Sequence, residues 1–359
     1  MQKDKAQNRV LSLDFFRGVT MFLLVAETTG LYDILGWEQF HHHEWNGLRF
    51  WDLIQPFFMF IVGVAMPVSL ANREAKGVSY KQNWKHILKR CFILLLMGVT
   101  IQCAYNNRLV WELWNVLAQM SVTILIAYAI MKLDIKWQMI ISIALLLFTD
   151  LTYRFFPVGG FDHPYVKDQN FGSWMDLVLM GKMNSGGGWV AINCIPTAAH
   201  TIWGVIAGRL MFDPAISNLN KLKYMTLLGV GFLVIGYGLD FAGIVPIIKR
   251  ISTASFVFAS GGWTILALAF CFWFIDIMKQ SKIVFPFAIV GMNSILIYLL
   301  TQTMGHQWFN GFVGIFVKGF GGLISIPEHP LAVITACVVL GLEWLFCYYL
   351  YKKSVFIKI

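Results

Sequence analysis

Residues 50–72 read FWDLIQPFFMFIVGVAMPVSLAN, and this stretch decides the fold class. A helix needs about 20 residues to cross the hydrocarbon core of a bilayer, and Asp52 is the single charged residue of the stretch. Similar runs recur along the 359-residue chain, which is 58% hydrophobic and 13% charged. In lipid the backbone must satisfy its own hydrogen bonds, and the runs lack the two-residue alternation of barrel strands. The sequence therefore predicts an all-α membrane protein and excludes a soluble globular one.

We expect about ten transmembrane helices in a single domain over residues 1–359. The expected spans are residues 16–36, 50–72, 86–104, 110–131, 137–153, 189–211, 223–243, 253–276, 284–304 and 331–351. The first span lacks a convincing cleavage site for a signal peptidase, so we expect it to be retained as a helix.

The net charge of +9 comes from basic residues between the spans, so it predicts topology and not binding to nucleic acid. If the N-terminus is cytoplasmic, twenty of the 28 Lys and Arg fall inside and eight outside. The outside group comprises Arg49, Arg108, Arg154, Lys167, Lys182, Lys249, Arg250 and Lys318. The positive-inside rule then predicts that both termini are cytoplasmic and that the segment with His41, His42 and His43 is external.

Ionisable side chains in apolar spans are costly in lipid and therefore indicate function. Glu27 lies in the outer half of the first span, Asp52 begins the second, and the three histidines lie between them. A histidine beside a carboxylate is a usual general base, because the acid fixes the tautomer and stabilises the imidazolium. Helix capping or interfacial binding of water and lipid is the alternative. No metal is expected, because adjacent histidines point in different directions and no acidic cluster stands at ligand spacing.

A polar stripe marks the fourth expected span, where Glu112, Asn115 and Gln119 recur at helical spacing. Such a stripe lines the interior of a bundle, or it holds neighbouring helices together by hydrogen bonds. The pattern leaves both interpretations open.

The chain contains four motifs whose order and spacing are specific to one protein family. They are LSLDFFRG (11–18), HHEWNGL (42–48), DLIQPFFMFIVG (52–63) and GMNSILIY (291–298). The chain resembles the heparan-alpha-glucosaminide N-acetyltransferase family over nearly its whole length. The resemblance implies an enzyme that takes an acetyl group from cytosolic acetyl-CoA and passes it across the membrane to the amine of a glucosamine-type sugar. One histidine of the first external loop would serve this transfer, and His42, three residues before Trp45, occupies its place.

The resemblance and the spacing together define the candidate site. His42 is the expected general base, with a covalent acetyl-histidine as the second mechanism, and Asp52 and Glu27 are expected to orient or charge-balance it. Asn46 or Asn293 could donate a hydrogen bond to the oxyanion. The candidates for substrate binding are Trp45, Asn46, Gln119 and Asn293. The candidates for binding the CoA phosphates are Lys89, Arg90, Arg209 and Lys223, although topology and lipid contact explain these basic residues equally well.

The chain resembles a compact bacterial relative, so we expect the bacterial inner membrane, with a periplasmic acceptor that is an amino sugar or a glycan. Membrane lipid is an expected partner, and a homo-oligomer is compatible with the sequence. Two other functions stay open. One is an amino-sugar transporter, which usually shows an internal repeat, and the other is an O-acyltransferase acting on an envelope glycan.

Overall fold

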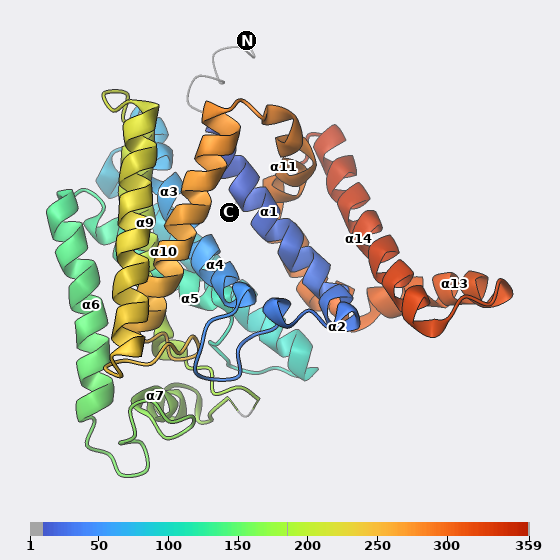
Figure 1. Ribbon diagram of the computed structural model, residues 1–359, viewed down its shortest axis with the longest axis horizontal. Helices are drawn as coiled ribbons and strands as arrows, with labels where there is room; N and C mark the ends of the chain where they lie inside the picture. The colour runs from blue at the N-terminus through green and yellow to red at the C-terminus, as the bar shows by residue number, and fades with distance from the viewer. Residues whose placement is uncertain (1–9, 185, 358–359) are drawn as a thin grey trace. The chain divides into compact units, whose positions relative to one another are not determined.

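The computed structural model describes residues 10–184 and 186–357, and all of the regular secondary structure in these ranges is helical (Figure 1). The all-α prediction is therefore confirmed. Four basic residues of the topology count, Lys3, Lys5, Arg9 and Lys358, lie outside the described ranges.

The helices group into two compact units. The first unit takes residues 10–41, 103–108 and 271–357, and the second takes residues 42–102, 109–184 and 186–270. The first contains α1 (Leu11–Thr28), α2 (Leu31–Leu35), η1 (Glu38–Phe40), η4 (Phe272–Ile277), η5 (Ser281–Ile283), α11 (Val284–Met292), α12 (Ser294–Leu300), η6 (Thr301–Phe309), α13 (Asn310–Leu323) and α14 (Glu328–Lys352). The second contains η2 (Phe50–Leu53), α3 (Ile54–Glu74), most of α4 (Tyr80–Asn106), α5 (Val116–Ile130), α6 (Ile135–Phe155), α7 (Phe171–Met180), η3 (Ala191–Asn193), α8 (Cys194–Phe212), α9 (Asn218–Phe241) and α10 (Ala254–Cys271).

Six helices of the described chain are long and apolar enough to cross a membrane. They are Phe50–Glu74, Tyr80–Asn106, Ile135–Phe155, Asn218–Phe241, Ala254–Ile277 and Glu328–Lys352. Ser281–Met292 and Ser294–Leu323, bent by 62° at their junction, would make a seventh if they form one broken span. Each of the ten predicted spans contains a helix, but the number of about ten is not confirmed. Helices α1, α5 and α8 are shorter or more polar than the six.

Helix α8 is central to the second unit and packs against α3, α5 and α6. Its contact with α3 depends on Gly63 and Gly204, because a Cβ on Gly204 would lie only 2.2 Å from the carbonyl oxygen of Phe60. A Cβ on Gly63 would lie 2.1 Å from the carbonyl oxygen of Thr201. Small residues let helix backbones approach this closely in membrane proteins. The contact holds α3 and α8 together, and with them the loops that lead into each helix.

The first unit is built on α1, which packs against α11. Two stretches of π-helix, η4 and η6, interrupt its α-helical segments. Helix α14 packs against α11 and α13 in the same unit.

Candidate active site

The candidate active site forms where three loops of the second unit meet. These are residues 42–49, which precede α3, residues 187–190, which precede α8, and residues 247–250, which precede α10. The backbone N–H of Gly47 donates to the carbonyl of Ile247 at 2.8 Å, and the N–H of Val190 donates to the carbonyl of Arg250 at 3.4 Å. The three helices therefore all begin at this site.

His42 and Asp52, the predicted base and its predicted carboxylate, are in contact, with 2.9 Å between His42 Nδ1 and Asp52 Oδ1. Asp52 is fully buried. Its second oxygen, Oδ2, accepts hydrogen bonds from the backbone N–H groups of His43 at 3.2 Å and Arg49 at 2.9 Å. Both carboxylate oxygens are thus occupied, so the carboxylate is held in one orientation.

Two groups of opposite kind lie at His42 Nδ1: the Asp52 carboxylate, which can only accept, at 2.9 Å, and the Lys249 ammonium, which can only donate, at 3.1 Å. Because the contact with Asp52 is the shorter one, we assign the proton to Nδ1 and the lone pair to Nε2. In residues 10–184 and 186–357, no side chain or backbone group hydrogen-bonds to Nε2. The His42 side chain is 40% exposed, which leaves Nε2 available to accept a proton from a substrate.

Lys249 is the third charged member of the site, and it was not among the residues predicted to lie there. Its Nζ lies 3.1 Å from His42 Nδ1 and 3.4 Å from Asp52 Oδ1, and its side chain is only 6% exposed. The ammonium also lies 5.4 Å from the ring centroid of Trp189, and the Trp189 and His42 rings make a T-shaped contact. Lys249 neutralises the buried charge of Asp52, since an unpaired carboxylate would be costly there.

Burial and the positive charge of Lys249 lower the pKa of His42 to about 4, against the hydrogen bond and charge of Asp52, which raise it. Burial lowers the pKa of Lys249 to about 8, although Asp52 favours the ammonium. At neutral pH the imidazole is therefore neutral and the lysine is charged. A neutral imidazole is the form that a general base needs.

Replacing Lys249 with methionine should raise the pKa of His42 from about 4 toward its ordinary range, because the repelling charge is lost while Asp52 remains. NMR titration of selectively labelled histidine would measure the shift, with His42→Ala to assign the signal. Lys136→Met, which removes a lysine from the start of α6, should leave the His42 titration unchanged. An unchanged pKa in Lys249→Met would contradict the assigned role of the ammonium.

Arg250 and Trp189 complete the site and were also missed. The Arg250 guanidinium lies 5.5 Å from the Trp189 ring centroid, donates to the carbonyl of His43 at 3.4 Å, and also donates to the carbonyl of Gly187. One signal was present in the sequence: Lys249 and Arg250 are adjacent basic residues in a segment predicted to be external, where the positive-inside rule expects few of them. A basic residue that departs from this rule is expected to have an acidic partner nearby, and for Lys249 that partner is Asp52.

The other two histidines of the run have different environments. His41 belongs to the first unit, where its Nε2 lies 2.8 Å from Asp33 Oδ1 and its Nδ1 lies 2.9 Å from the carbonyl oxygen of Trp37. The His43 ring packs beside Gly47, whose φ of 141° favours glycine and whose absent Cβ would lie 2.6 Å from His43 Nε2. No three His, Cys, Asp or Glu side chains of the described ranges gather as they would around a metal ion.

The predicted substrate-binding residues are spread over both units. In the second unit, Trp45 Nε1 donates to the carbonyl of Tyr165 at 2.8 Å, Asn46 is exposed, and Gln119 is buried and accepts from Gln55 at 2.6 Å. Asn46 therefore lies in the same loop as His42, with an exposed side chain.

Asn293 and Glu27 belong to the first unit. The Asn293 amide donates to the carbonyl of Val355 at 3.0 Å and accepts from the N–H of Ile357 at 3.0 Å, so it fastens the C-terminal segment. Glu27 lies near the end of α1. The predicted roles of these two residues at His42 stay predictions.

Two of the predicted CoA-binding residues, Lys89 and Arg90, lie on α4. Nearby on α3, Arg73 Nη2 lies 2.8 Å from Nε2 of His86, which is on α4 as well. Arg90 Nε is buried, and no group within the described part of the chain accepts a hydrogen bond from it. This cluster of positive groups, with an unused donor, suits a phosphate.

The remaining two predicted CoA-binding residues lie elsewhere. Arg209 of α8 donates to the carbonyls of Leu133, at 2.8 Å, and Met131. It thereby satisfies carbonyl groups that follow the end of α5. Lys223 is exposed on α9. Their assignment to CoA also stays a prediction.

The helices and the site define a membrane protein with a histidine–carboxylate pair for acid–base chemistry. The family described as "Heparan-alpha-glucosaminide N-acetyltransferase, catalytic" matches residues 9–237. The chain belongs to this family of membrane acetyltransferases, as the motif resemblance predicted.

Two curated relatives carry the name heparan-alpha-glucosaminide N-acetyltransferase. The protein from Mus musculus is 25% identical over 418 residues, an alignment that covers 98% of this chain and 61% of the relative. The protein from Homo sapiens is 24% identical, with 98% of this chain and 60% of the relative covered. The chain thus spans about three-fifths of the length of these relatives.

Proposed function

We propose that the protein transfers an acetyl group from cytosolic acetyl-CoA to the amino group of a glucosamine-type sugar on the opposite side of the membrane. The observation that carries the proposal is the state of His42. Its Nδ1 is held by Asp52, its side chain is 40% exposed, and its Nε2 has no hydrogen-bond partner among the described residues. This arrangement, in a chain of an N-acetyltransferase family, supports a general base for amine acetylation.

The proposed reaction is a direct transfer. His42 Nε2 takes a proton from the sugar ammonium, the amine nitrogen bonds to the thioester carbonyl carbon, and the C–S bond breaks. The amine loses two protons in all: His42 passes one to the departing thiolate, which leaves as CoA thiol, and water takes the other. Asp52 would stabilise the imidazolium while it exists. Asn46 is the candidate donor to the oxyanion.

We place the protein in a bacterial inner membrane with both termini in the cytoplasm and the His42 loop outside. Glu44 is exposed in that loop, so cysteine at position 44 should react with a membrane-impermeant maleimide added to intact cells from the periplasmic side. A cysteine in place of Lys136, on a predicted inside segment, should react only after the membrane is opened. Labelling of position 44 from the cytoplasmic side alone would refute this topology.

We further propose that the cluster of Arg73, His86, Lys89 and Arg90 receives the CoA phosphates. Arg90→Gln should raise the KM for acetyl-CoA by about 10- to 100-fold, the usual value of one hydrogen bond to a charged group, with a smaller effect on kcat. Lys136→Gln is the control for lost surface charge. A normal KM in Arg90→Gln would remove the support for this phosphate site.

One experiment separates the proposed activity from a transporter and from an O-acyltransferase. Purified protein in liposomes receives radiolabelled acetyl-CoA on one side and glucosamine on the other, and a parallel sample receives labelled glucosamine alone. We expect labelled N-acetylglucosamine in the first sample and no uptake in the second. Uptake without acetyl-CoA would indicate a transporter, and a product labile to mild base would indicate an O-ester.

A further inference from the structure

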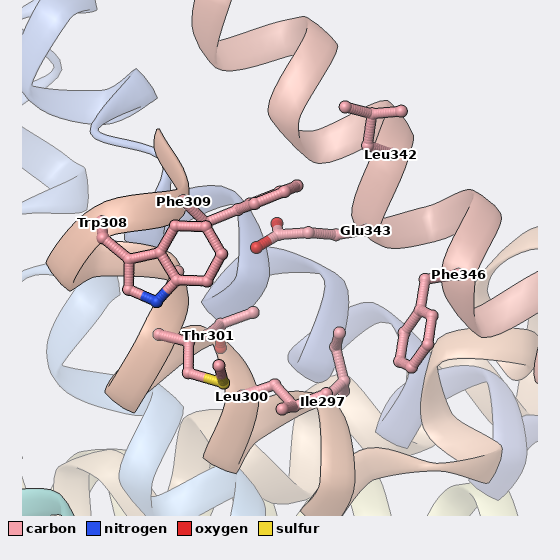
Figure 2. A pocket seen from close by; sticks show the side chains of 10 residues that line it. Ile297, Leu300, Thr301, Trp308, Phe309, Leu342, Glu343 and Phe346 are labelled. Atoms are coloured by element: carbon pink, nitrogen blue, oxygen red, sulfur yellow. The ribbon is translucent and has the colours of Figure 1, made fainter. Parts of the chain in front are cut away.

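A second site lies in the first unit, between η6 and α14 (Figure 2). It is a cavity of about 250 Å³. Its walls are apolar except for Thr301 and Glu343, and all of its lining residues belong to the first unit. The catalytic proposal uses none of them.

Glu343 is the charged group of this cavity. It is 7% exposed, and its Oε2 is buried without a hydrogen-bond partner within the described ranges. No Lys, Arg or His side chain in the described part of the chain forms an ion pair with it. Glu343 lies within α14, one of the six helices able to cross a membrane. An ionised carboxylate in such surroundings is costly unless a counter-charge reaches it.

The opposite wall is shaped to admit a group beside this carboxylate. The wall is η6, a run of π-helix over Thr301–Phe309, and π-helical segments are rare and often mark functional sites. Gly305 of η6 faces Glu343, because a Cβ there would lie 3.3 Å from Glu343 Oε1. A side chain at position 305 would narrow the cavity at the carboxylate.

Three aromatic side chains, Trp308, Phe309 and Phe346, line the cavity, and Figure 2 shows Glu343 pointing from α14 toward Trp308 and Phe309. Trp308 is half-exposed, so this part of the cavity lining reaches the surface of the first unit. A carboxylate attracts a cation through its charge, and aromatic rings in the same cavity add to that attraction where the cation meets a ring face. The rest of the wall, from Met304 to Leu342 and Phe346, suits hydrocarbon.

We propose that this cavity binds a hydrophobic primary ammonium ion, with the ammonium group on Glu343 and a single aliphatic chain along the apolar wall. A neutral amphiphile would fill the space but would leave the carboxylate without a counter-charge, and an anion would be repelled. The small volume favours one chain over the two chains of a diacyl phospholipid. This site is distinct from the proposed acetyl transfer and does not rest on it.

The test uses the full chain in nanodiscs of phosphatidylcholine, which carries no primary amine. Two probes of equal length are compared: an octylamine and an octanol, each with a diazirine on the chain. After irradiation, mass spectrometry maps the labelled peptides. We expect the amine probe to label residues 297–309 or 342–346, and unlabelled octylamine to compete with it.

Two variants test whether Glu343 recognises the ammonium group or whether any probe with an apolar chain fills the cavity. Glu343→Gln, which keeps the shape of the side chain, should weaken amine labelling by about 10- to 100-fold and leave octanol labelling unchanged. Glu328→Gln, in the first turn of the same helix and outside the cavity, should behave like the wild type. The thermal unfolding midpoint of each variant checks that it folds. Equal labelling by amine and alcohol in the wild type, or no labelling of these peptides by either probe, would overturn the proposal.

Discussion

Replacing His42 with alanine should lower the rate of acetyl transfer by about 10²- to 10⁴-fold, the usual contribution of a general base. The loss should appear mainly in kcat, because proton transfer belongs to the transition state and not to substrate binding. The protein should still fold, since the ring is 40% exposed and buries little apolar surface. The measurement is turnover of labelled acetyl-CoA with glucosamine by the purified protein.

The neighbouring histidines provide matched controls for this variant. His41→Ala and His43→Ala should stay within about tenfold of the wild-type rate, which is a barrier change of about 1.4 kcal/mol or less. His41 pairs with Asp33, and the His43 contact to Asp52 is made by its backbone N–H, which alanine retains. If His42→Ala turns over normally while His43→Ala or Glu27→Ala is inactive, the base must be reassigned to the residue whose loss abolishes turnover.

Changing Asp52 to asparagine should cost about as much as removing His42, about 10²- to 10⁴-fold in rate. Two backbone N–H groups, from His43 and Arg49, point at Oδ2 and require an acceptor there. The amide oxygen of asparagine must therefore take that position, which turns its NH2 group toward His42. An NH2 group favours the tautomer with the lone pair on Nδ1, so Nε2 would carry a proton and lose its function as a base.

Asp33→Asn is the control for this second prediction, because it makes the same change beside His41. It should leave turnover within about tenfold of the wild type. The ¹⁵N chemical shifts of labelled His42 would report the tautomer directly, which separates a tautomer effect from misfolding. A normal tautomer together with normal turnover in Asp52→Asn would contradict the role that we assign to Asp52.

The His42–Asp52 pair was predictable because its two members are close in the sequence. Ten residues separate them, and the short loop before α3 brings them within 2.9 Å without help from distant parts of the chain. The motif around Trp45 and Gly47 also placed His42 in that loop. Local spacing and residue chemistry were sufficient for this part of the site.

Lys249 and Trp189 were not predictable in the same way. Each precedes a different helix, and each reaches His42 only because α8 and α10 begin at the same place as α3. Hydropathy identifies the helices but not which of them pack together, since lipid-facing and protein-facing apolar surfaces have similar compositions. The close glycine contact between α3 and α8 depends on which helix faces are in contact, and one sequence does not specify that.

The number of membrane spans was also not predictable from hydropathy, because it too depends on which helices pack together. Helix α8 is not among the six clear candidates, and most of its residues are buried within the protein, including the polar His200 and Thr201. A helix surrounded by other helices can carry polar groups that hydrogen-bond within the bundle. Hydropathy alone therefore cannot separate a central helix of a membrane bundle from a helix of a soluble core.

The sequence by itself determined the fold class, the family and the identity of the central pair, because these follow from apolar run length, motif order and local spacing. Tertiary structure decided the charge state of the site. It placed a buried ammonium 3.1 Å from His42 Nδ1 and 3.4 Å from Asp52 Oδ1, across about 200 residues of sequence. The physical reason is that electrostatic interactions depend on separation in space and on burial, and both are set by helix packing.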